Sequence, residues 1–371
     1  MRVLAITINM FPNSGWGRYA RAIGFEFARQ GVETDMLTYK KSEEPIVEGV
    51  CREYPVLIEK LSLISMVRNC LTVRKYAKNA DVVHAFDVWP FSIYGYVAVL
   101  GTNKKLFVTG VGTYSVVPMR STIKKFIIGL ALRRAQRILS VSEYTKKRLL
   151  EMIKLDTIDI VWWGTSPLAR LPEEKMGEYR QKFGITNEQP IILTVGQIKE
   201  RKGQFDILKA VEMLIPKYPN ILYCAIGSDK NKVHADSIRA YVKEKNLEKH
   251  FRFVTNAKTD EDLAFFYQSA NIFAMTSNST DEYFEGFGLV FLEAEHFGKP
   301  VIASRGSGTE EAMKDGYNGY TVNQRDSKDI ALKIAMILQG KEEEFGKNSI
   351  EFQKNFTWQK TADAYLSYYK K

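Results

Sequence analysis

The stretch DEYFEGFGLVFLEAEHFGKPVIAS, residues 281–304, carries the strongest fold signal in the chain. Residues 289–297 are rich in Leu, Glu and Ala, which favour a helix. Gly298 suits a left-handed helix terminator, and Pro300 prevents the helix from continuing. Residues 301–303 (VIA) then have the composition of a short buried strand. The stretch therefore predicts a loop, a helix, a stop and a strand in that order.

Gly286 and Gly288 stand just before the predicted helix, where backbone N–H groups can approach a ligand closely. The N-terminus of a helix favours an anion such as a phosphate. Glu285 and Glu293 bracket this entry with seven residues between them, and a carboxylate can accept hydrogen bonds from sugar hydroxyls. Together these groups describe a nucleotide-sugar site. The alternative is an ordinary amphipathic helix with two solvated carboxylates.

The chain has 371 residues, of which 45% are hydrophobic and 26% charged, as expected for a soluble globular protein of two domains. Its three cysteines and four histidines show no metal-ligand spacing, and the odd cysteine count indicates a reducing compartment. The opening residues do not resemble a signal peptide. The most apolar window, 88–101, is shorter than the about 18 residues of a membrane span. We therefore expect a cytoplasmic protein, either free or peripheral on the inner face of the membrane.

Positive charge is concentrated in the first part of the chain. Residues 1–170 contain 25 Lys and Arg against 14 Asp and Glu, a net of +11, whereas the remainder has 28 against 29, a net of −1. Nine of the basic residues fall within 120–148, where the segment 121–138 is also amphipathic. This segment suits an anionic membrane surface, and a core-facing helix with a solvated basic side is the alternative. Nucleic acid is not expected, because no recognition helix or aromatic sheet motif accompanies the charge.

Strands and helices are predicted to alternate along the whole chain, which indicates α/β domains with doubly wound sheets. In the first part the expected strands are 2–8, 32–38, 81–86, 105–109, 137–142 and 157–162, and the expected helices are 19–30, 61–77, 123–137 and 143–153. The start of a proline- and charge-rich stretch at 165–187 marks the domain boundary. The pattern then restarts, with strands expected at 190–195, 221–226, 251–254, 272–275, 301–303 and 319–322, and helices at 204–214, 233–245, 261–268, 289–297 and 328–338.

A second informative stretch is VGQIKERKGQFDILKA, residues 195–210. A strand ends at Val195, Gly196 turns the chain, and Lys202 and Gly203 lead into the next helix. A lysine at this place can reach a diphosphate held at the carboxyl ends of the strands. An ordinary charged surface loop is the alternative.

The segment EGFGLVFLEA (285–294) resembles the motif of retaining glycosyltransferases with two Rossmann-like domains, most closely glycosyltransferase family 4 of the group 1 type. Further similarities follow in the family order at SGWGRYA (14–20), 135–151, 195–210, 221–229 and 304–322. The resemblance implies the GT-B architecture, with two Rossmann-like domains facing a central cleft. It places an acceptor-binding domain at 1–165, a nucleotide-sugar-binding domain at 166–355, and at 356–371 a helix that returns to the first domain.

The resemblance also implies the reaction, which is transfer of a sugar from a nucleoside diphosphate sugar to an acceptor hydroxyl with retained configuration. The acceptor would be a glycan or a lipid-linked acceptor, as in the synthesis of cell-surface polysaccharide. No enzymatic nucleophile is implied, because the donor phosphate is thought to deprotonate the acceptor. No metal and no cofactor are implied either. The oligomeric state stays open.

Roles transfer to matching positions of this chain as follows. Glu285 and Lys202 would be catalytic, Glu293 would bind the ribose, and Arg18, Ser142 and Glu143 would lie near the acceptor or cleft. The other donor-binding positions would be Gly17, Gln197, Arg201, Gly227, Gly286, Phe287, Gly288 and Leu289.

Two departures from the family pattern are present. Gln197 stands where the family has an arginine, so Lys199 or Arg201 is expected to supply that charge. Val111 or Gly112 occupies the place of a cleft histidine, while His84 lies on another strand and is expected to be a core residue. Three alternatives follow from the residues: a non-catalytic binder of sugar nucleotides, a basic protein that binds membrane or nucleic acid on the same scaffold, and a sugar-nucleotide epimerase.

Overall fold

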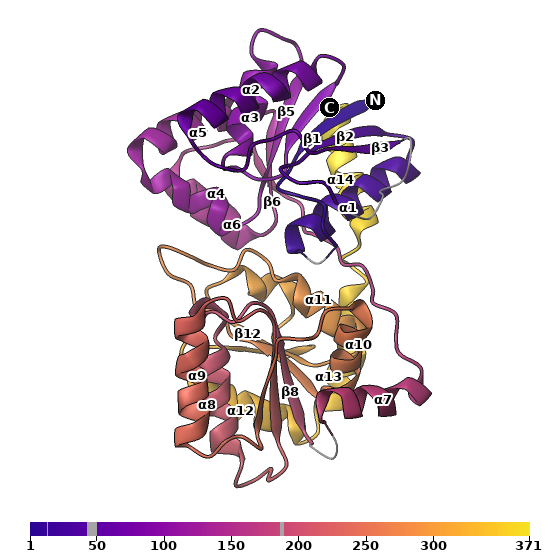
Figure 1. Ribbon diagram of the computed structural model, residues 1–371, viewed down its shortest axis with the longest axis vertical. Helices are drawn as coiled ribbons and strands as arrows, with labels where there is room; N and C mark the ends of the chain where they lie inside the picture. The colour runs from indigo at the N-terminus through magenta and orange to yellow at the C-terminus, as the bar shows by residue number, and fades with distance from the viewer. Residues whose placement is uncertain (13, 43–49, 186–188) are drawn as a thin grey trace. The chain divides into compact units, whose positions relative to one another are not determined.

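The computed structural model describes residues 1–12, 14–42, 50–185 and 189–371. The chain divides into two compact units, which are distinct in the ribbon of Figure 1. The first unit is Met1–Gly164 together with Phe356–Lys371, and the second is Thr165–Asn355. The division falls one residue before the boundary expected at 165/166. The last residues of the proline- and charge-rich stretch, 186 and 187, lie outside the described residues.

Within the described residues the first unit contains a parallel sheet of seven strands in the order β3-β2-β1-β4-β5-β6-β7. Its strands are β1 (Arg2–Ile6), β2 (Glu33–Leu37), β3 (Cys51–Tyr54), β4 (Val82–Ala85), β5 (Lys105–Gly110), β6 (Arg137–Ser140) and β7 (Ile158–Ile160). Its helical elements are α1 (Gly15–Arg29), α2 (Leu63–Ala77), α3 (Phe91–Val99), α4 (Thr113–Val116), η1 (Val117–Arg120), α5 (Thr122–Arg134), α6 (Glu143–Met152) and α14 (Trp358–Lys370).

Strand order decides which helices share a face of this sheet. The connection from β1 to β2 runs in one direction along the sheet, and those from β3 to β4, β5 and β6 run in the other. Parallel crossovers are right-handed, so α1 covers one face while α2, α3 and α5 cover the opposite face in that order. Contacts of α2 with α3 and of α3 with α5 agree with this single layer.

The C-terminal helix α14 packs on α1 in the first unit. Tyr365 and Tyr369 of α14 are buried, and the Tyr369 hydroxyl lies 2.5 Å from Nδ1 of His84. The other ring nitrogen of His84 lies 2.9 Å from the Thr109 hydroxyl. Burial lowers the pKa of His84 to about 3. His84 is therefore a neutral core residue with both nitrogens hydrogen-bonded, as expected from the sequence.

The described part of the second unit contains a parallel sheet of six strands in the order β10-β9-β8-β11-β12-β13. The strands are β8 (Ile191–Val195), β9 (Leu222–Ile226), β10 (Phe251–Val254), β11 (Ile272–Met275), β12 (Val301–Ser304) and β13 (Gly319–Val322). The helical elements are α7 (Glu173–Phe183), η2 (Glu200–Lys202), α8 (Gln204–Leu214), α9 (Lys232–Glu244), α10 (Asp260–Ser269), α11 (Leu289–His296), η3 (Gly308–Ala312), α12 (Ser327–Leu338) and α13 (Glu342–Gln353).

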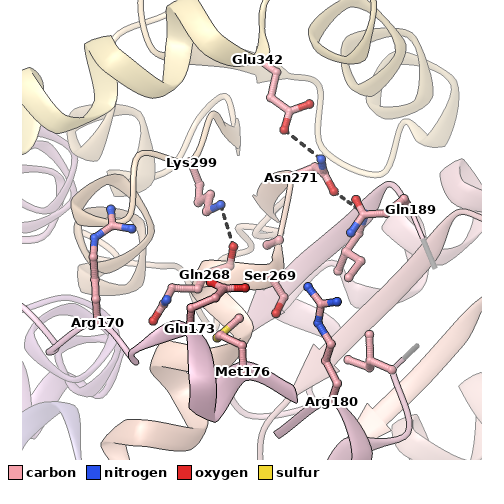
Figure 2. Close-up of a pocket in the computed structure, with 13 residues that line it drawn as sticks. Arg170, Glu173, Met176, Arg180, Gln189, Gln268, Ser269, Asn271, Lys299 and Glu342 are labelled. Atoms are coloured by element: carbon pink, nitrogen blue, oxygen red, sulfur yellow. Dashed lines mark hydrogen bonds between the residues drawn. The ribbon is translucent and has the colours of Figure 1, made fainter. Parts of the chain in front are cut away.

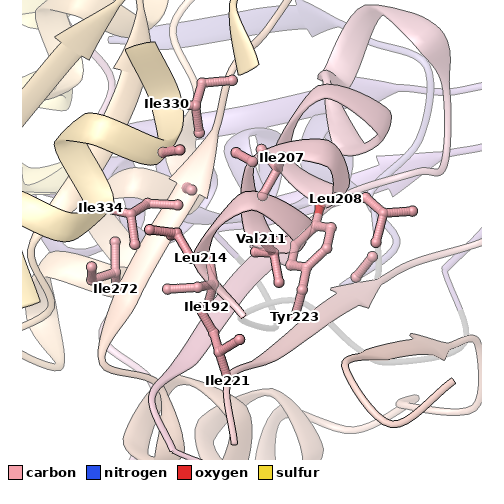
Figure 3. Packing of buried hydrophobic residues seen from close by; sticks show 14 of the residues in the cluster. Ile192, Ile207, Leu208, Val211, Leu214, Ile221, Tyr223, Ile272, Ile330 and Ile334 are labelled. Atoms are coloured by element: carbon pink, nitrogen blue, oxygen red, sulfur yellow. The ribbon is translucent and has the colours of Figure 1, made fainter. Parts of the chain in front are cut away.

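Figure 3 shows the core of the second unit, where branched side chains from the central strands meet those of α8 and α12. Ile192 of β8 and Ile272 of β11 pack there with Ile207 and Val211 of α8 and Ile334 of α12, and all five are fully buried. Both faces of a parallel sheet are covered by helices, which explains why its strands read as continuous apolar runs.

The predicted α/β class and its doubly wound sheets are confirmed, but several of the described elements were not expected, among them β3, α3, α7 and α13. The helix α3 is apolar on nearly every side and largely buried, so it lacks the amphipathic pattern by which surface helices are recognised. The helix α7 lies within the stretch 165–187, where no helix was expected. No helix in the described residues is long and apolar enough to cross a membrane.

Candidate functional site

The order of strands in the second unit defines where a ligand is expected. The chain passes from β8 outward to β9 and β10, then returns to β11 on the other side of β8. The gap between β8 and β11 is thus the topological switch point, and open α/β sheets bind ligands outside the carboxyl ends of strands there. Lys202 follows β8 and Glu285 follows β11, so both predicted catalytic residues come from loops at this edge.

Three charged side chains meet at the switch point. Oε2 of Glu285 lies 2.7 Å from Nζ of Lys202, and the same oxygen contacts Nη1 of Arg201. The side chains of Lys202 and Glu285 are only 10% and 16% exposed. Two cations surround one carboxylate in a largely dry environment, which leaves the cluster with one excess positive charge.

The two cations of this cluster favour the ionised form of Glu285. Burial opposes ionisation of Glu285, but Lys202 and Arg201 outweigh it and lower the pKa of the Glu285 carboxyl to about 2. Burial also lowers the pKa of Lys202, while the Glu285 carboxylate opposes that shift. The pKa of Lys199 is lowered by partial burial and by the nearby Arg201. Of the two residues expected to replace the family arginine, Arg201 is the one that reaches Glu285.

Glycines bring the loops of this edge into backbone contact. Gly203, at φ +71°, lies where a Cβ would be 2.1 Å from the carbonyl oxygen of Thr276. A Cβ on Gly227 would lie 2.1 Å from the carbonyl oxygen of Gly196. The loops after β8, β9 and β11 can therefore pack backbone to backbone only with glycine at these positions. Gly227, predicted to bind the donor, packs closely against the backbone of the neighbouring loop at Gly196.

The entry to α11 is held in the same way. A Cβ on Gly308 would lie 2.0 Å from the carbonyl oxygen of Gly286, and the amide of Gly308 donates to the carbonyl of Glu285. Gly288 adopts a left-handed conformation directly before the helix. Phe287 is buried and Leu289 is half-buried. Residues 285–289 thus form a backbone turn that is packed against η3.

Glu293 lies on α11 and is buried. Its Oε2 accepts a hydrogen bond of 2.8 Å from the Tyr267 hydroxyl. Gln197 contributes its backbone carbonyl, which accepts from Nε2 of Gln204 at 3.1 Å. The Tyr267 hydrogen bond orients the Glu293 carboxylate. The Gln204 hydrogen bond ties the start of α8 to Gln197, at the other end of the loop that carries Lys202.

Two buried polar groups at this edge were missed by sequence reasoning. The hydroxyl of Ser277 and Oδ1 of Asn278 follow β11 directly, and neither atom has a hydrogen-bond partner among the described residues. Buried polar atoms are nearly always paired, so these two are open to a ligand or to water. The polar run TSNST at 276–280 was the available signal.

In the first unit, Gly17 and Arg18 belong to the loop after β1 and the first turn of α1. The Gly17 amide donates to the Ser14 hydroxyl at 2.9 Å, and Nε of Arg18 donates to the carbonyl of Pro12 at 2.9 Å. A Cβ on Gly17 would collide with the Phe11 carbonyl at 2.0 Å. Both residues thus stabilise the loop that leads into α1.

Ser142 and Glu143 begin α6 after β6. The Ser142 side chain caps this helix by accepting from the Thr145 amide at 3.0 Å, and Glu143 lies exposed in its first turn. The strands β4 and β5 separate β6 from β1 in the sheet, so these two residues do not lie beside Gly17 and Arg18. The predicted residues of the first unit form two separate groups.

Asp87 is another residue that sequence reasoning passed over. It follows β4 at the switch point of the first sheet, between β1 and β4, and is buried. Its Oδ1 accepts from the Val88 amide at 2.7 Å and from the Ser115 hydroxyl. Burial raises the pKa of Asp87 to about 7. The signal was an aspartate directly after a buried strand.

A cavity of about 600 Å³ lies elsewhere in the second unit, and Figure 2 shows its lining. Ile191, Asn271 and Lys299 place it at the amino ends of β8, β11 and β12, the opposite edge of the sheet from Lys202 and Glu285. Burial lowers the pKa of Lys299 to about 8, and its Nζ donates to the Gln268 carbonyl at 3.0 Å. None of the predicted site residues lines this cavity.

Across the described ranges of the chain, no three His, Cys, Asp or Glu side chains are grouped so as to hold a metal ion. The three cysteines are free thiols.

Two doubly wound parallel sheets, one with a buried ion cluster at its switch point, define a chain of the GT-B architecture of glycosyltransferases. The profile "Glycosyl transferases group 1" matches residues 175–352, and the profile "Glycosyltransferase Family 4" matches residues 13–165. The protein belongs to glycosyltransferase family 4, of the group 1 type.

Individual relatives agree with this assignment. An uncharacterized glycosyltransferase of Methanocaldococcus jannaschii is 27% identical over 337 residues, which are 89% of this chain and 87% of the relative. The crystal structure of a glycosyltransferase from Rickettsia africae superposes with a TM-score of 0.82 at 20% identity, covering 100% of this chain and 97% of that one. An Anabaena protein in complex with UDP-glucose superposes with a TM-score of 0.77 at 16% identity, covering 99% and 100%.

Proposed function

We propose that this glycosyltransferase moves a sugar from a nucleoside diphosphate sugar to an acceptor hydroxyl with retention of configuration. The observation that carries the proposal is the cluster of Lys202, Arg201 and Glu285 at the switch point of the second sheet. Its excess positive charge suits the diphosphate of the donor, and its carboxylate suits sugar hydroxyls. The UDP-glucose held by the similar Anabaena protein supports this class of donor.

The ion pairs indicate an exchange when the donor binds. In the free site Glu285 holds both cations. A diphosphate entering beside Lys202 and Arg201 would take the place of the carboxylate as their hydrogen-bond acceptor. Glu285 would then turn to the sugar hydroxyls. The same carboxylate would thus position the cations before the donor arrives and the sugar afterwards.

The remaining donor contacts follow from their places at this edge. Glu293, oriented by Tyr267, would accept hydrogen bonds from the ribose hydroxyls. The turn of Gly286, Phe287, Gly288 and Leu289 at the start of α11 would present backbone amides to the donor. The unpaired Ser277 hydroxyl and Asn278 Oδ1 are added as donor contacts. Gln197 and Gly227 complete the proposed donor set in the second unit.

The chemical step would need positioning and charge stabilisation rather than a protein nucleophile. Lys202 and Arg201 would stabilise negative charge on the departing diphosphate as the glycosidic bond breaks. The phosphate would take the proton of the acceptor hydroxyl on the same face of the sugar. Two cations at this edge would offset negative charge on the diphosphate, so the proposal requires no metal and no cofactor.

The acceptor would bind the first unit, with Arg18, Ser142 and Glu143 as its proposed contacts. A glycan or a lipid-linked acceptor used in building cell-surface polysaccharide fits the basic first unit, which contains residues 120–148. That segment would bring the enzyme to an anionic membrane from the inner face. The free thiols suit this reducing side.

A panel of UDP-, GDP- and ADP-sugars tests the proposal by thermal stabilisation and by hydrolysis of the donor, with Glu285→Ala and Glu293→Ala as comparison variants. We expect one nucleotide class to raise Tm and to be hydrolysed slowly, and both variants to lose hydrolysis. Absence of stabilisation by every nucleotide sugar would overturn the proposal. Stabilisation without hydrolysis or transfer to any acceptor would indicate a non-catalytic binder of sugar nucleotides.

A further inference from the structure

The helix α2 has its amphipathic pattern reversed. Helices on a globular protein normally turn their large apolar side chains toward the core. In α2 the buried positions are instead small or polar: Ser65, Asn69, Val73 and Ala77. The large apolar residues Leu63, Ile64, Val67 and Leu71 point outward, with Leu63 80% and Ile64 74% exposed.

The buried face of α2 is built to keep this orientation. The Asn69 side chain accepts from the Ile58 amide, donates to the Ile58 carbonyl and donates to the Tyr94 hydroxyl of α3. The Arg74 guanidinium donates to the carbonyls of Val97 and Leu100 at the end of α3. Turning the apolar face inward would break these polar contacts, so its exposure is a fixed feature of the fold.

The neighbouring helices extend this apolar surface. The layer on this face of the sheet has the order α2, α3, α5, and Figure 1 shows these helices together in the first unit. On α5, Ile123 and Phe126 are 74% and 66% exposed and Leu130 is also exposed. Between them, α3 presents half-buried Tyr96 and Val97.

The charged residues within α2, α3 and α5 have a single sign. The sequences of α2 and α5 contain no Asp or Glu. Their basic residues are Arg68, Arg74, Lys75, Lys124, Lys125, Arg133 and Arg134. Nζ of Lys124 lies 4.9 Å from the ring centroid of Trp89, which places a cation and an indole together at the start of α3. Exposed apolar side chains on helices whose only charged residues are cations match the acyl and headgroup layers of an anionic bilayer.

We propose that the outward faces of α2, α3 and α5, called here the lipid face, lie on an anionic lipid bilayer. Leu63, Ile64 and Phe126 enter the region below the headgroups, and the basic residues contact lipid phosphates. The sequence had indicated only the segment 120–148, whereas the structure adds the reversed helix α2. The proposal rests on the proposed function only in that a lipid-linked acceptor would then be presented to the first unit.

A second copy of this chain is the other candidate occupant, and its charge argues against it. Two lipid faces brought together would set like charges against each other and bury them away from water. An anionic lipid surface supplies the opposite charge instead, worth about fivefold in partitioning for each basic residue near the headgroups.

The test is co-sedimentation of the full chain with vesicles of phosphatidylcholine alone and of phosphatidylcholine with phosphatidylglycerol. We expect binding to the anionic vesicles that weakens with added salt. The double variant Leu63→Ser/Ile64→Ser, and separately Phe126→Ser, should reduce partitioning about tenfold or more. Val233→Ser is the matched control, because Val233 is 84% exposed on α9 of the second unit. It should bind vesicles as the parent does.

Two further measurements distinguish the outcomes. Hydrolysis of a nucleotide sugar in the absence of vesicles should be the same in all these variants, so a failure of the lipid proposal leaves the donor reaction intact. The proposal would be overturned if the parent protein did not co-sediment with anionic vesicles, or if the Leu63→Ser/Ile64→Ser and Phe126→Ser variants bound them as well as the parent does. Self-association in sedimentation velocity that Leu63→Ser/Ile64→Ser abolishes would also overturn it, because it would make a second copy the occupant.

Discussion

The two sheets share one architecture but differ in where they hold charge. At the switch point of the second sheet, Lys202 and Arg201 enclose Glu285 in a nearly dry site. At the switch point of the first sheet, Asp87 is buried and bonded to Ser115, with neutral His84 on the strand before it. In the first unit, seven basic residues lie instead on the helices α2 and α5. The second unit concentrates charge where the donor diphosphate is proposed to bind, and the first spreads positive charge over two helices.

The largest expected effect comes from removing a cation of the second sheet. Lys202→Met should lower turnover of the nucleotide sugar by about 100-fold or more, because it removes the ammonium group that stabilises charge on the leaving diphosphate. It also leaves the buried Glu285 with Arg201 as its remaining cation, which should cost about 3 kcal/mol of unfolding free energy. Steady-state kinetics and urea unfolding measure the two effects.

Lys243→Met, on an exposed part of α9, is the control for loss of a lysine charge and should leave both quantities nearly unchanged. If Lys202→Met kept full turnover, the ion cluster would be only structural. The contrast between the two sheets would then have no functional meaning.

A second variant tests the proposed exchange at Glu285. Glu285→Gln should tighten binding of the free nucleoside diphosphate on the order of tenfold, because the carboxylate no longer competes for Lys202 and Arg201. Turnover should nevertheless fall by about 100-fold, since a neutral amide with one accepting oxygen replaces the carboxylate that holds the sugar hydroxyls. Calorimetric titration and kinetics on one preparation give both values. Weaker diphosphate binding in Glu285→Gln would contradict the exchange.

A third variant tests the backbone packing that positions the cluster. Gly203→Ala places a Cβ 2.1 Å from the Thr276 carbonyl at φ +71°, so the loops after β8 and β11 must separate. We expect a loss of about 3 kcal/mol in unfolding free energy, together with reduced turnover. Gly184→Ala is the matched control, because Gly184 has φ +63° and a Cβ added there would meet nothing within 4 Å. It should cost about 1 kcal/mol from strain alone.

The predictable part of the site is the part that is local in sequence. Gly288 and the helix after it are adjacent in the chain, and Lys202 follows its strand within one loop, so their elements could be assigned from composition. The contact between Arg201 and Glu285 joins residues 84 positions apart. It depends on β8 and β11 being neighbours, which no local pattern encodes. The sequence therefore left Lys199 and Arg201 as equal candidates.

The lipid face could not be predicted for a different reason. The assumption that large apolar residues face the core assigns Leu63 and Ile64 to the interior, and the structure places them outside. The polar partners of Asn69 decide the orientation of α2, and they lie on other elements. The helix within 356–371 was easier to predict, because its aromatic residues recur at helical spacing.

The smallest expected effect concerns two titrating groups in the first sheet. His84 has a pKa of about 3 when folded against 6.5 in the unfolded chain. Below pH 6.5 the unfolded chain therefore binds a proton that the folded chain lacks. The free energy of unfolding then falls by about 1.4 kcal/mol for each pH unit of acidification. Asp87 has a folded pKa of about 7 against 3.8. Between these values the folded chain holds the extra proton, so stability rises by a similar slope as the pH falls.

In the parent these slopes oppose each other between pH 3.8 and 6.5. In His84→Gln only the pH dependence due to Asp87 remains, so this variant should become more stable than the parent on acidification. In Asp87→Asn only the pH dependence due to His84 remains, so this variant should become less stable than the parent on acidification. All five tryptophans lie in the first unit, so urea unfolding followed by tryptophan fluorescence reports on this unit. The double variant should lack both slopes. If the unfolding free energies of the two single variants depended equally on pH, burial would not set the protonation state of either group. The neutral interior of the first sheet would then no longer contrast with the charged edge of the second.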